Sequence, residues 1–197
     1  SKNLIHVFHL LESAKKTGPS VAPRRVERAA VLGAGAMGGG IAQLLAYRDI
    51  DVRLKDINSD ALSLGLKHAR DMFDRLVKRG RVEKRDAERH MDAIAPTLDY
   101  TGFGTVDVVI EAVVERMNVK QQVLRETESH VRAGCVLATN TSSLSVTEMQ
   151  GALARPQDFA GMHFFNPVHR MPLVEVIRGE QTSDEAVATI VALTRRL

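Results

Sequence analysis

The sequence contains no tryptophan, only one cysteine and few aromatic residues, which make up 4% of its 197 positions. So few aromatic side chains argue against a surface that stacks nucleic-acid bases. The single cysteine, Cys135, cannot form a disulfide within the chain and fits a reducing compartment, so we expect a cytoplasmic protein. Long hydrophobic runs are also missing, because Asp107 and Glu111 interrupt the most apolar stretch, residues 106–114. No stretch reaches the roughly 20 apolar residues that a membrane-spanning helix needs.

Charge of one sign is not concentrated in any segment. The chain has 27 basic and 24 acidic residues, a net charge of +3 and no long basic run. This balance predicts no nucleic-acid partner. Hydrophobic residues make up 44% and charged residues 26%, as in folded domains generally. A chain of this length has room for one sizeable core.

The first 24 residues differ in character from the rest. Apolar residues recur at helical spacing through residues 3–16 and predict an amphipathic helix. A linker is expected next, because residues 17–23 are rich in glycine and proline. We therefore expect a linker helix and linker over residues 1–24 and the main domain over residues 25–197.

After residue 24, short apolar runs typical of strands alternate with helical patterns. This alternation predicts βα units and a parallel sheet, so the fold class is α/β. The expected strands cover residues 28–32, 51–55, 106–110, 135–138, 160–165 and 173–177. The expected helices cover residues 36–47, 59–79, 117–132 and 145–152, and a last helix begins near residue 183.

A glycine-rich loop directly follows the first predicted strand. It has the pattern G-x-G-x-x-G, and a helical pattern begins within it. In this context the first glycine allows a tight turn, the second lets the backbone approach a pyrophosphate, and the third lets the helix pack on the sheet. The helix N-terminus adds free N–H groups and a positive partial charge. We expect a Rossmann-like, doubly wound and mostly parallel sheet that binds a dinucleotide through Gly33, Gly35, Ala36, Met37 and Gly38.

Asp56 ends the second predicted strand, 23 residues after Gly33. At that position a carboxylate can accept hydrogen bonds from the ribose hydroxyls of the cofactor. The same carboxylate repels the additional 2′-phosphate of NADP, which favours NAD. Arg53 and Lys55 lie nearby in the sequence and could weaken this repulsion.

His163 interrupts an otherwise apolar strand, and Glu175 interrupts the next strand twelve residues later. Either side chain is costly to bury alone, so we predict that adjacent strands bring the two within hydrogen-bond reach. The carboxylate would fix the imidazole tautomer and favour its charged form, so the other ring nitrogen can accept a proton from an alcohol. Such a pair suits a dehydrogenase in which a nicotinamide takes the hydride. A satisfied core histidine is the plainer alternative.

A run of hydroxyl-bearing residues follows the strand at residues 135–138, at the sheet edge where ligands of open α/β sheets bind. Ser143 or Ser145 is expected to cap the following helix. Another hydroxyl of the run then remains for a substrate.

The glycine loop, residues 140–144 (NTSSL) and the run from Gly161 to Ile177, which contains His-Phe-Phe-Asn-Pro, resemble the NAD-binding domain of 3-hydroxyacyl-CoA dehydrogenases. The resemblance covers about residues 26–197. It implies NAD-dependent oxidation of (S)-3-hydroxyacyl-CoA to 3-oxoacyl-CoA in fatty acid beta-oxidation, with His163 as the base and Glu175 as its partner. It also implies that Ser142 donates a hydrogen bond to the substrate oxygen and that Asn166 lies near the nicotinamide. The implied further cofactor contacts are Glu115, Lys120, Asn140 and, again, Ser142.

The resemblance further implies an acyl-CoA substrate, whose nucleotide phosphates could meet Lys78 or Arg79. No metal is implied. Residues 3–16 resemble the helix that joins the hydratase and dehydrogenase parts of multifunctional beta-oxidation enzymes, as in the bacterial fatty acid oxidation complex alpha subunit. Other domains of such a polypeptide, and a homo-oligomer of the parent enzyme, are therefore expected partners. The family continues into a helical C-terminal domain, whereas this chain stops at Leu197, so we expect an incomplete active site.

Two other interpretations stay open. A β-hydroxyacid dehydrogenase of the type that uses a catalytic lysine on a helix shares the glycine loop but not the histidine–glutamate pair. A dinucleotide-binding module without catalysis would bind NADH with no dependence on acyl-CoA. A transcriptional redox sensor is disfavoured, because neither a helix-turn-helix pattern nor a clustered basic face accompanies the loop.

Overall fold

The computed structural model describes residues 20–197, so the helix predicted over residues 3–16 lies outside the described residues. The strands are β1 (Arg28–Leu32), β2 (Asp51–Lys55), β3 (Ile94–Thr97), β4 (Val108–Glu111), β5 (Val136–Thr139), β6 (Phe159–Phe164) and β7 (Val174–Ile177). The helices are α2 (Ala36–Tyr47), α3 (Ser59–Lys78), α4 (Lys84–Asp92), α5 (Met117–His130), α6 (Val146–Gln150) and α7 (Asp184–Arg196), with 3-10 turns at Phe103–Thr105 and Pro156–Asp158.

The strands form one sheet in the order β3-β2-β1-β4-β5-β6-β7. Strands β1 to β6 are parallel, and β7 pairs antiparallel with β6 at the edge of the sheet. The strand order reverses direction between β1 and β4, and this is the point where open α/β sheets bind ligands. The predicted Rossmann-like, mostly parallel fold is confirmed.

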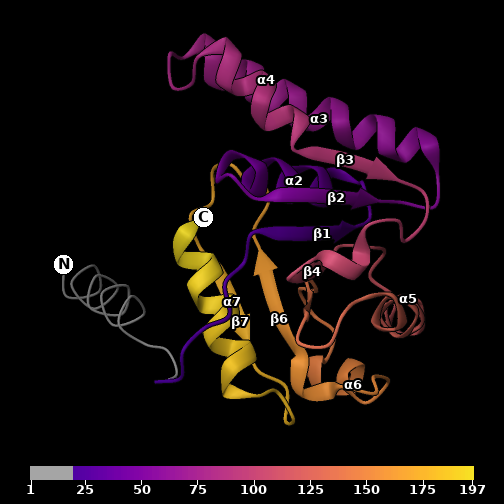
Figure 1. Cartoon of the computed structure of the whole chain (residues 1–197). Helices are drawn as coiled ribbons and strands as arrows, with labels where there is room; N and C mark the ends of the chain where they lie inside the picture. The colour runs from indigo at the N-terminus through magenta and orange to yellow at the C-terminus, as the bar shows by residue number, and fades with distance from the viewer. Residues whose placement is uncertain (1–19) are drawn as a thin grey trace, which may run out of the picture.

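Helices cover the sheet on both sides, and the alternation of each strand decides which side chains face which layer (Figure 1). Ala29 and Val31 of β1 pack in one core with α2, α3, α4 and α7. Ala30 and Leu32 face the opposite core, with α5, α6 and the turn at Phe103. Because both faces are buried, the middle residues of the central strands β1, β4 and β5 are apolar.

Two elements have no counterpart among those predicted from the sequence. Helix α4 has only a narrow apolar side, with Ala87 and Met91 buried, and its other residues are largely charged. Strand β3 has four residues and includes Pro96. Proline is tolerated there because β3 is an edge strand, so one side of it needs no ladder hydrogen bonds. Both segments are too short and too irregular in pattern to stand out in the sequence.

Arg24 joins the start of the domain to its far end. Its guanidinium donates to the Gly134 carbonyl (2.6 Å), to Asp158 (2.9 Å) and to Glu185 (2.7 Å), while its own N–H donates to the Thr189 hydroxyl. These contacts hold the segment before β1 against α7.

Within residues 20–197, every helix is too short or too polar to cross a membrane.

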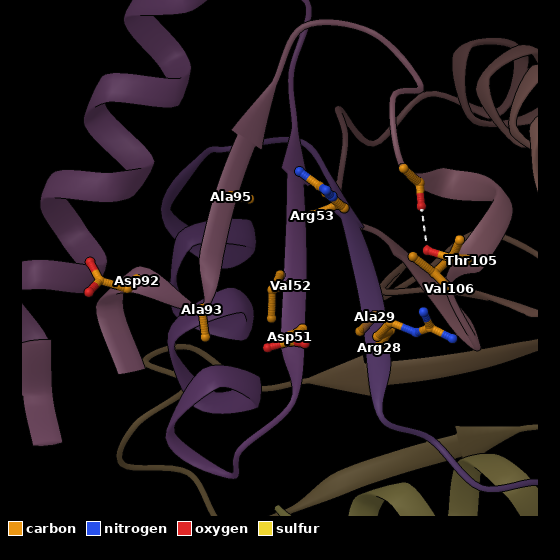
Figure 2. Close-up of a pocket in the computed structure, with 11 residues that line it drawn as sticks. Arg28, Ala29, Asp51, Val52, Arg53, Asp92, Ala93, Ala95, Thr105 and Val106 are labelled. Carbon is orange, nitrogen blue, oxygen red and sulfur yellow. Dashed lines mark hydrogen bonds between the residues drawn. The ribbon is translucent and has the colours of Figure 1, made fainter. Parts of the chain in front are cut away.

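A hollow of about 300 Å³ lies where β1, β2 and β3 begin (Figure 2). Its lining includes Arg28, Asp51, Asp92 and Arg53. This edge is opposite to the one that carries the glycine loop, so it is not the edge at which open α/β sheets bind ligands.

Candidate active site

The glycine loop connects β1 to α2 at the carboxyl edge of the sheet, and each glycine has a separate steric role. Gly33 has a φ of +91°, and a Cβ there would lie 2.7 Å from the Ala112 carbonyl oxygen. A Cβ at Gly38 would overlap the Gly33 carbonyl oxygen, whereas a Cβ at Gly35 would enter open space. Helix α2 begins after Gly35 with no side chain capping it. The loop therefore offers uncapped N–H groups beside a free volume, which suits a pyrophosphate.

Asp56 lies next to this loop, just after β2. Its carboxylate accepts hydrogen bonds from the N–H groups of Ala34 (2.8 Å) and Ile57 (2.7 Å). These bonds fix the carboxylate at the edge of the loop, as the interpretation of a ribose acceptor requires. The neighbouring Ile57 is 90% exposed and offers an apolar surface beside it, a feature that the sequence analysis missed. Lys55, by contrast, is turned to the ring of Tyr100, 4.6 Å from its centroid.

His163 and Glu175 face each other directly across the antiparallel pairing of β6 and β7. The Nδ1 of His163 lies 2.8 Å from Oε2 of Glu175. The predicted pairing is therefore present. The histidine side chain is 15% exposed and that of Glu175 is 53% exposed, because β7 is the edge strand of the sheet. The expectation that both residues lie on buried strands is thus wrong for the glutamate.

A cavity of about 320 Å³ lies between the glycine loop and this pair. It brings together seven of the residues that the sequence assigns to the site. Its lining comprises Met37, Ala112, Val113, Glu115, Lys120, Asn140, Ser142, His163, Phe164, Phe165 and Asn166. A second hollow of about 360 Å³ shares Ser142 and His163 with the first and reaches Glu175 and Arg178. His163 and Ser142 therefore lie between two adjoining spaces.

In the polar segment after β5, some hydroxyls bond to the backbone and one is exposed. Ser145 caps α6, because its Oγ accepts from the Glu148 N–H at 3.2 Å. The Thr141 Oγ accepts from the N–H groups of Ser143 and Leu144. The hydroxyl of Ser142, in contrast, bonds to no atom of residues 20–197, and its residue is exposed. Ser145 is thus the cap, and Ser142 presents a free hydroxyl beside His163.

A buried cluster of charged side chains lies beside this segment. Lys120 on α5 is 1% exposed, and its ammonium lies 2.7 Å from Glu111 Oε1, 3.2 Å from Glu115 Oε2 and 3.3 Å from the Val113 carbonyl oxygen. Glu111, which is 0% exposed, also accepts from the Thr139 hydroxyl at 2.7 Å. The roles of Glu111 and Thr139 in this cluster were not predicted from the sequence. The sequence signal that could have pointed to the cluster was the carboxylate of Glu111 within the apolar run at residues 106–114.

Glu115 connects the cluster to the hydroxyl segment. Its Oε1 accepts from the Thr141 hydroxyl, from the Ser142 N–H (3.1 Å) and from the Ser143 hydroxyl (3.4 Å). Partial burial acts to raise the pKa of Glu115, but the Thr141 hydroxyl, the Lys120 ammonium and the Ser142 N–H outweigh it and lower that pKa. The carboxylate is therefore ionised at neutral pH.

Three more of the predicted residues, Asn140, Lys78 and Arg79, lie at two different places in the structure. The Asn140 side chain is an acceptor for the Phe164 N–H (2.8 Å) and so joins the end of β5 to the end of β6. Lys78 and Arg79 are exposed at the C-terminal end of α3 and line neither space beside His163. Lys78 lines a separate hollow of about 220 Å³ between α3 and α4.

In residues 20–197, no three histidine, cysteine, aspartate or glutamate side chains form a metal-binding group.

Known proteins resemble this chain in sequence and in fold. Residues 28–197 match the family described as the NAD-binding domain of 3-hydroxyacyl-CoA dehydrogenase. The chain is 36% identical to (S)-3-hydroxybutyryl-CoA dehydrogenase from Ralstonia eutropha, with a TM-score of 0.85 over 87% of this chain and 61% of that one. It is 35% identical to 3-hydroxybutyryl-CoA dehydrogenase from Escherichia coli K12, with a TM-score of 0.85 over 88% of this chain and 37% of that one.

A multifunctional enzyme is also among the similar structures. The dehydrogenase part of multifunctional enzyme 1 from C. elegans is 27% identical, with a TM-score of 0.80 over 95% of this chain and 46% of that one. The chain spans less than two thirds of the length of each of these relatives. With its glycine loop, Asp56 and the histidine–glutamate pair at one sheet edge, the chain belongs to the 3-hydroxyacyl-CoA dehydrogenase family, as the NAD-binding domain of that family.

Proposed function

We propose that this chain is the part of a 3-hydroxyacyl-CoA dehydrogenase that binds NAD and removes the substrate proton. The reaction is the oxidation of an (S)-3-hydroxyacyl-CoA to a 3-oxoacyl-CoA. The observation that carries the proposal is the 2.8 Å contact between His163 Nδ1 and Glu175 Oε2, at the boundary of two adjoining spaces. One space extends toward the glycine loop, and the other is open to a second ligand.

The pair prepares His163 to act as a base. An ionised carboxylate only accepts hydrogen bonds, so the proton in the contact with Glu175 belongs to Nδ1. The Nε2 lone pair is then free to accept the proton of a substrate hydroxyl. The negative charge of Glu175 stabilises the imidazolium that forms, and the Ser142 hydroxyl can donate to the same substrate oxygen.

The glycine loop and Asp56 fit NAD. The uncapped start of α2 would hold the pyrophosphate, and Asp56 would accept from the ribose hydroxyls. When bound, NAD supplies the acceptor for the hydride that leaves the carbon of the hydroxyl. The protein's own share is to hold that carbon between the cofactor and His163.

The acyl-CoA substrate is supported by the relatives, since both bacterial ones are named for hydroxybutyryl-CoA. We also propose that the chain acts in fatty acid beta-oxidation, within a larger polypeptide or an oligomer. The domain boundary at residue 24 and a cytoplasmic location are further parts of the proposal. The multifunctional relative supports the presence of further domains.

A catalytic lysine is the rival arrangement, and the geometry disfavours it. Lys120 is the helix lysine that lines the cavity. Its ammonium has three N–H donors, and two carboxylates and one carbonyl already accept from them. A lysine held in this way is not available as a proton acceptor.

The test measures NADH binding and consumption with the purified chain. NADH fluorescence is titrated first, and acetoacetyl-CoA is then added while the absorbance of reduced nicotinamide is followed. We expect NADH to bind, and consumption, where it occurs, to fall by about 10²- to 10⁴-fold in His163→Ala. The matched control is His68→Ala, on α3 outside both spaces. Full activity in the His163 variant would contradict the proposal, whereas binding without consumption in the wild type would identify a cofactor domain that needs its partner domain.

A further inference from the structure

We propose that Tyr100 strengthens the preference for NAD over NADP by holding the ammonium of Lys55 away from the cofactor ribose. This inference rests on the proposed function, in which Asp56 accepts from the ribose hydroxyls. Arg53 and Lys55 precede Asp56 on β2 and are the cations nearest to it in the sequence. Either of them could offset the negative charge that repels a 2′-phosphate, so their positions bear on the choice of cofactor.

The Asp56 carboxylate is held by backbone N–H groups. Its Oδ2 accepts from Ala34 (2.8 Å), and its Oδ1 accepts from Ile57 (2.7 Å) and from Asn58 (3.3 Å). Within residues 20–197, no lysine or arginine forms an ion pair with Asp56. The negative charge of this carboxylate is therefore not paired with a cation, and it would repel a phosphate on the ribose 2′-oxygen.

The ammonium of Lys55 lies over the ring of Tyr100, although Lys55 directly precedes Asp56. Its Nζ is 4.6 Å from the ring centroid, which is within the range of a cation–π contact. In the part of the chain that the structure describes, this ammonium forms no ion pair and no hydrogen bond. The aromatic ring is therefore the contact that fixes its position.

The Tyr100 ring is itself fixed by its neighbours. The imidazole of His130, at the end of α5, stacks on it with the centroids 4.2 Å apart and the planes 8° apart. Phe103 packs edge-on with its centroid at 5.1 Å, and the phenol oxygen lies 3.3 Å from the Thr127 hydroxyl. The stacked imidazole covers one face of the ring, which leaves the other face for the Lys55 ammonium.

Arg53 packs against the same segment, two residues further on. Gly102 has a φ of +86°, and a Cβ there would lie 2.6 Å from Nε of Arg53. Arg53 also lines the hollow where β1, β2 and β3 begin, at the edge opposite to the glycine loop. Tyr100 and Gly102 thus keep both cations of β2 in contact with residues 100–102, and Asp56 remains unpaired.

Loss of the aromatic ring would free Lys55 to act at the ribose. Adjacent Cα atoms are about 3.8 Å apart, and lysine carries its charge on a flexible four-carbon stem. A released ammonium could therefore pair with Asp56 or meet a 2′-phosphate directly. Both contacts would weaken the repulsion of NADP, whereas NAD has no phosphate at that position.

The test measures the Kd for NADH and the Kd for NADPH by fluorescence titration of the purified chain at one ionic strength. The ratio of the two constants cancels any general loss of cofactor binding. We expect Tyr100→Leu to lower the ratio of the NADPH Kd to the NADH Kd by about three- to tenfold. Tyr100→Phe, the matched control that keeps the ring, should leave the ratio within about twofold of wild type. Addition of Lys55→Met to Tyr100→Leu should restore the wild-type ratio.

An NMR measurement detects the contact without any cofactor. Protons over an aromatic face shift upfield, so the Lys55 side-chain protons should be shifted upfield in the wild type. The shift should be lost in Tyr100→Leu and kept in Tyr100→Phe. Circular dichroism checks that each variant is folded.

Three results would overturn the inference. A wild-type ratio in Tyr100→Leu would show that the ring does not affect the choice of cofactor. A lowered ratio that persists after Lys55→Met would assign the effect to another group. Lys55 protons without an upfield shift in the wild type would show that the ring does not hold the ammonium. Failure of the wild-type chain to bind NADH would instead contradict the proposed function, and the NMR shift would still decide whether Tyr100 holds Lys55.

Discussion

The ammonium of Lys120 lies 2.7 Å from the carboxylate of Glu111, and neither side chain is more than 1% exposed. The two residues come from α5 and from the end of β4, at the point where the strand order reverses. Water cannot compensate either charge there, so each depends on the other. The pair therefore affects both the stability of this sheet edge and the geometry of the adjacent site.

Lys120→Met should be strongly destabilising, because it leaves Glu111 charged and buried without its cation. We expect a loss of about 3–5 kcal/mol in the free energy of unfolding. Urea unfolding followed by circular dichroism measures it. Lys67→Met, an exposed change on α3, should remain within about 0.5 kcal/mol of wild type. Equal effects of the two changes would mean that the buried pair contributes little.

Gly35→Ala and Gly38→Ala should separate cofactor binding from folding. Gly35 has a φ of −68°, and its added Cβ enters open space, so the variant should keep its stability. The methyl group would occupy the path of a pyrophosphate, and we expect NADH affinity to fall by about tenfold or more. Gly38→Ala places a methyl group against the Gly33 carbonyl, which should cost about 1–3 kcal/mol in stability.

Thermal unfolding measures the stability of both glycine variants, and NADH titration measures their affinity for the cofactor. Unchanged NADH affinity in a folded Gly35→Ala chain would exclude the loop as the phosphate site.

Glu175→Gln should change the state of His163 without weakening NADH binding. In the proposed function the carboxylate, 2.8 Å from Nδ1, holds the ring proton on that nitrogen, whereas an amide can either donate or accept. Long-range ¹H–¹⁵N spectra of the histidine ring should show the Nδ1–H tautomer in the wild type and a larger share of Nε2–H in the variant. A wild-type ring protonated mainly at Nε2 would contradict the assigned role of Glu175.

The features that the sequence predicted are those encoded by local patterns. The glycine loop is one contiguous motif, and its steric demands follow from the turn between β1 and α2. The pairing of His163 with Glu175 follows from two polar interruptions in apolar strands, because an antiparallel register places residues that flank a connecting loop opposite each other. Local spacing was sufficient in both cases.

The features that the sequence did not predict depend on tertiary contacts. Glu111, Lys120 and Thr139 meet only after three elements have packed, and no periodicity marks them as partners. The exposure of Glu175 depends on whether a strand lies beyond β7, which strand patterns do not specify. Helix α4 is mostly charged, so its narrow buried side, Ala87 and Met91, gave a weak signal.

Cys135 should be inert in the folded protein. Burial raises the pKa of its thiol to about 12, so almost no thiolate forms at pH 8. We expect no reaction with an aromatic disulfide reagent until denaturant is added, after which one thiol per chain reacts. Ser129→Cys, at an exposed position on α5, should add one thiol that reacts at once. Rapid modification of the native wild type would show that the segment just before β5 opens readily.

Asp107 connects stability to pH at the other edge of the sheet. Partial burial acts to raise the pKa of its carboxyl, but the N–H groups of Glu27 and Arg28 and the guanidinium of Arg132 outweigh it and lower that pKa. Folding therefore favours the ionised form. Its contribution is complete above the unfolded pKa, near about pH 4, and is lost as the pH falls through the lower folded value.

Asp107→Asn should remove this contribution. At pH 7 we expect the variant to be less stable than wild type by about 1–3 kcal/mol, because the charge-assisted bond from Arg132 (2.6 Å) is lost. The difference should shrink as the pH falls from about 4 toward 2, since the wild-type carboxyl is then protonated as well. Urea unfolding at a series of pH values measures it, with the exposed Asp71→Asn on α3 as the matched control. A stability difference that stays constant over this range would mean that the side chain acts through its shape and hydrogen bonds, and its charge contributes nothing.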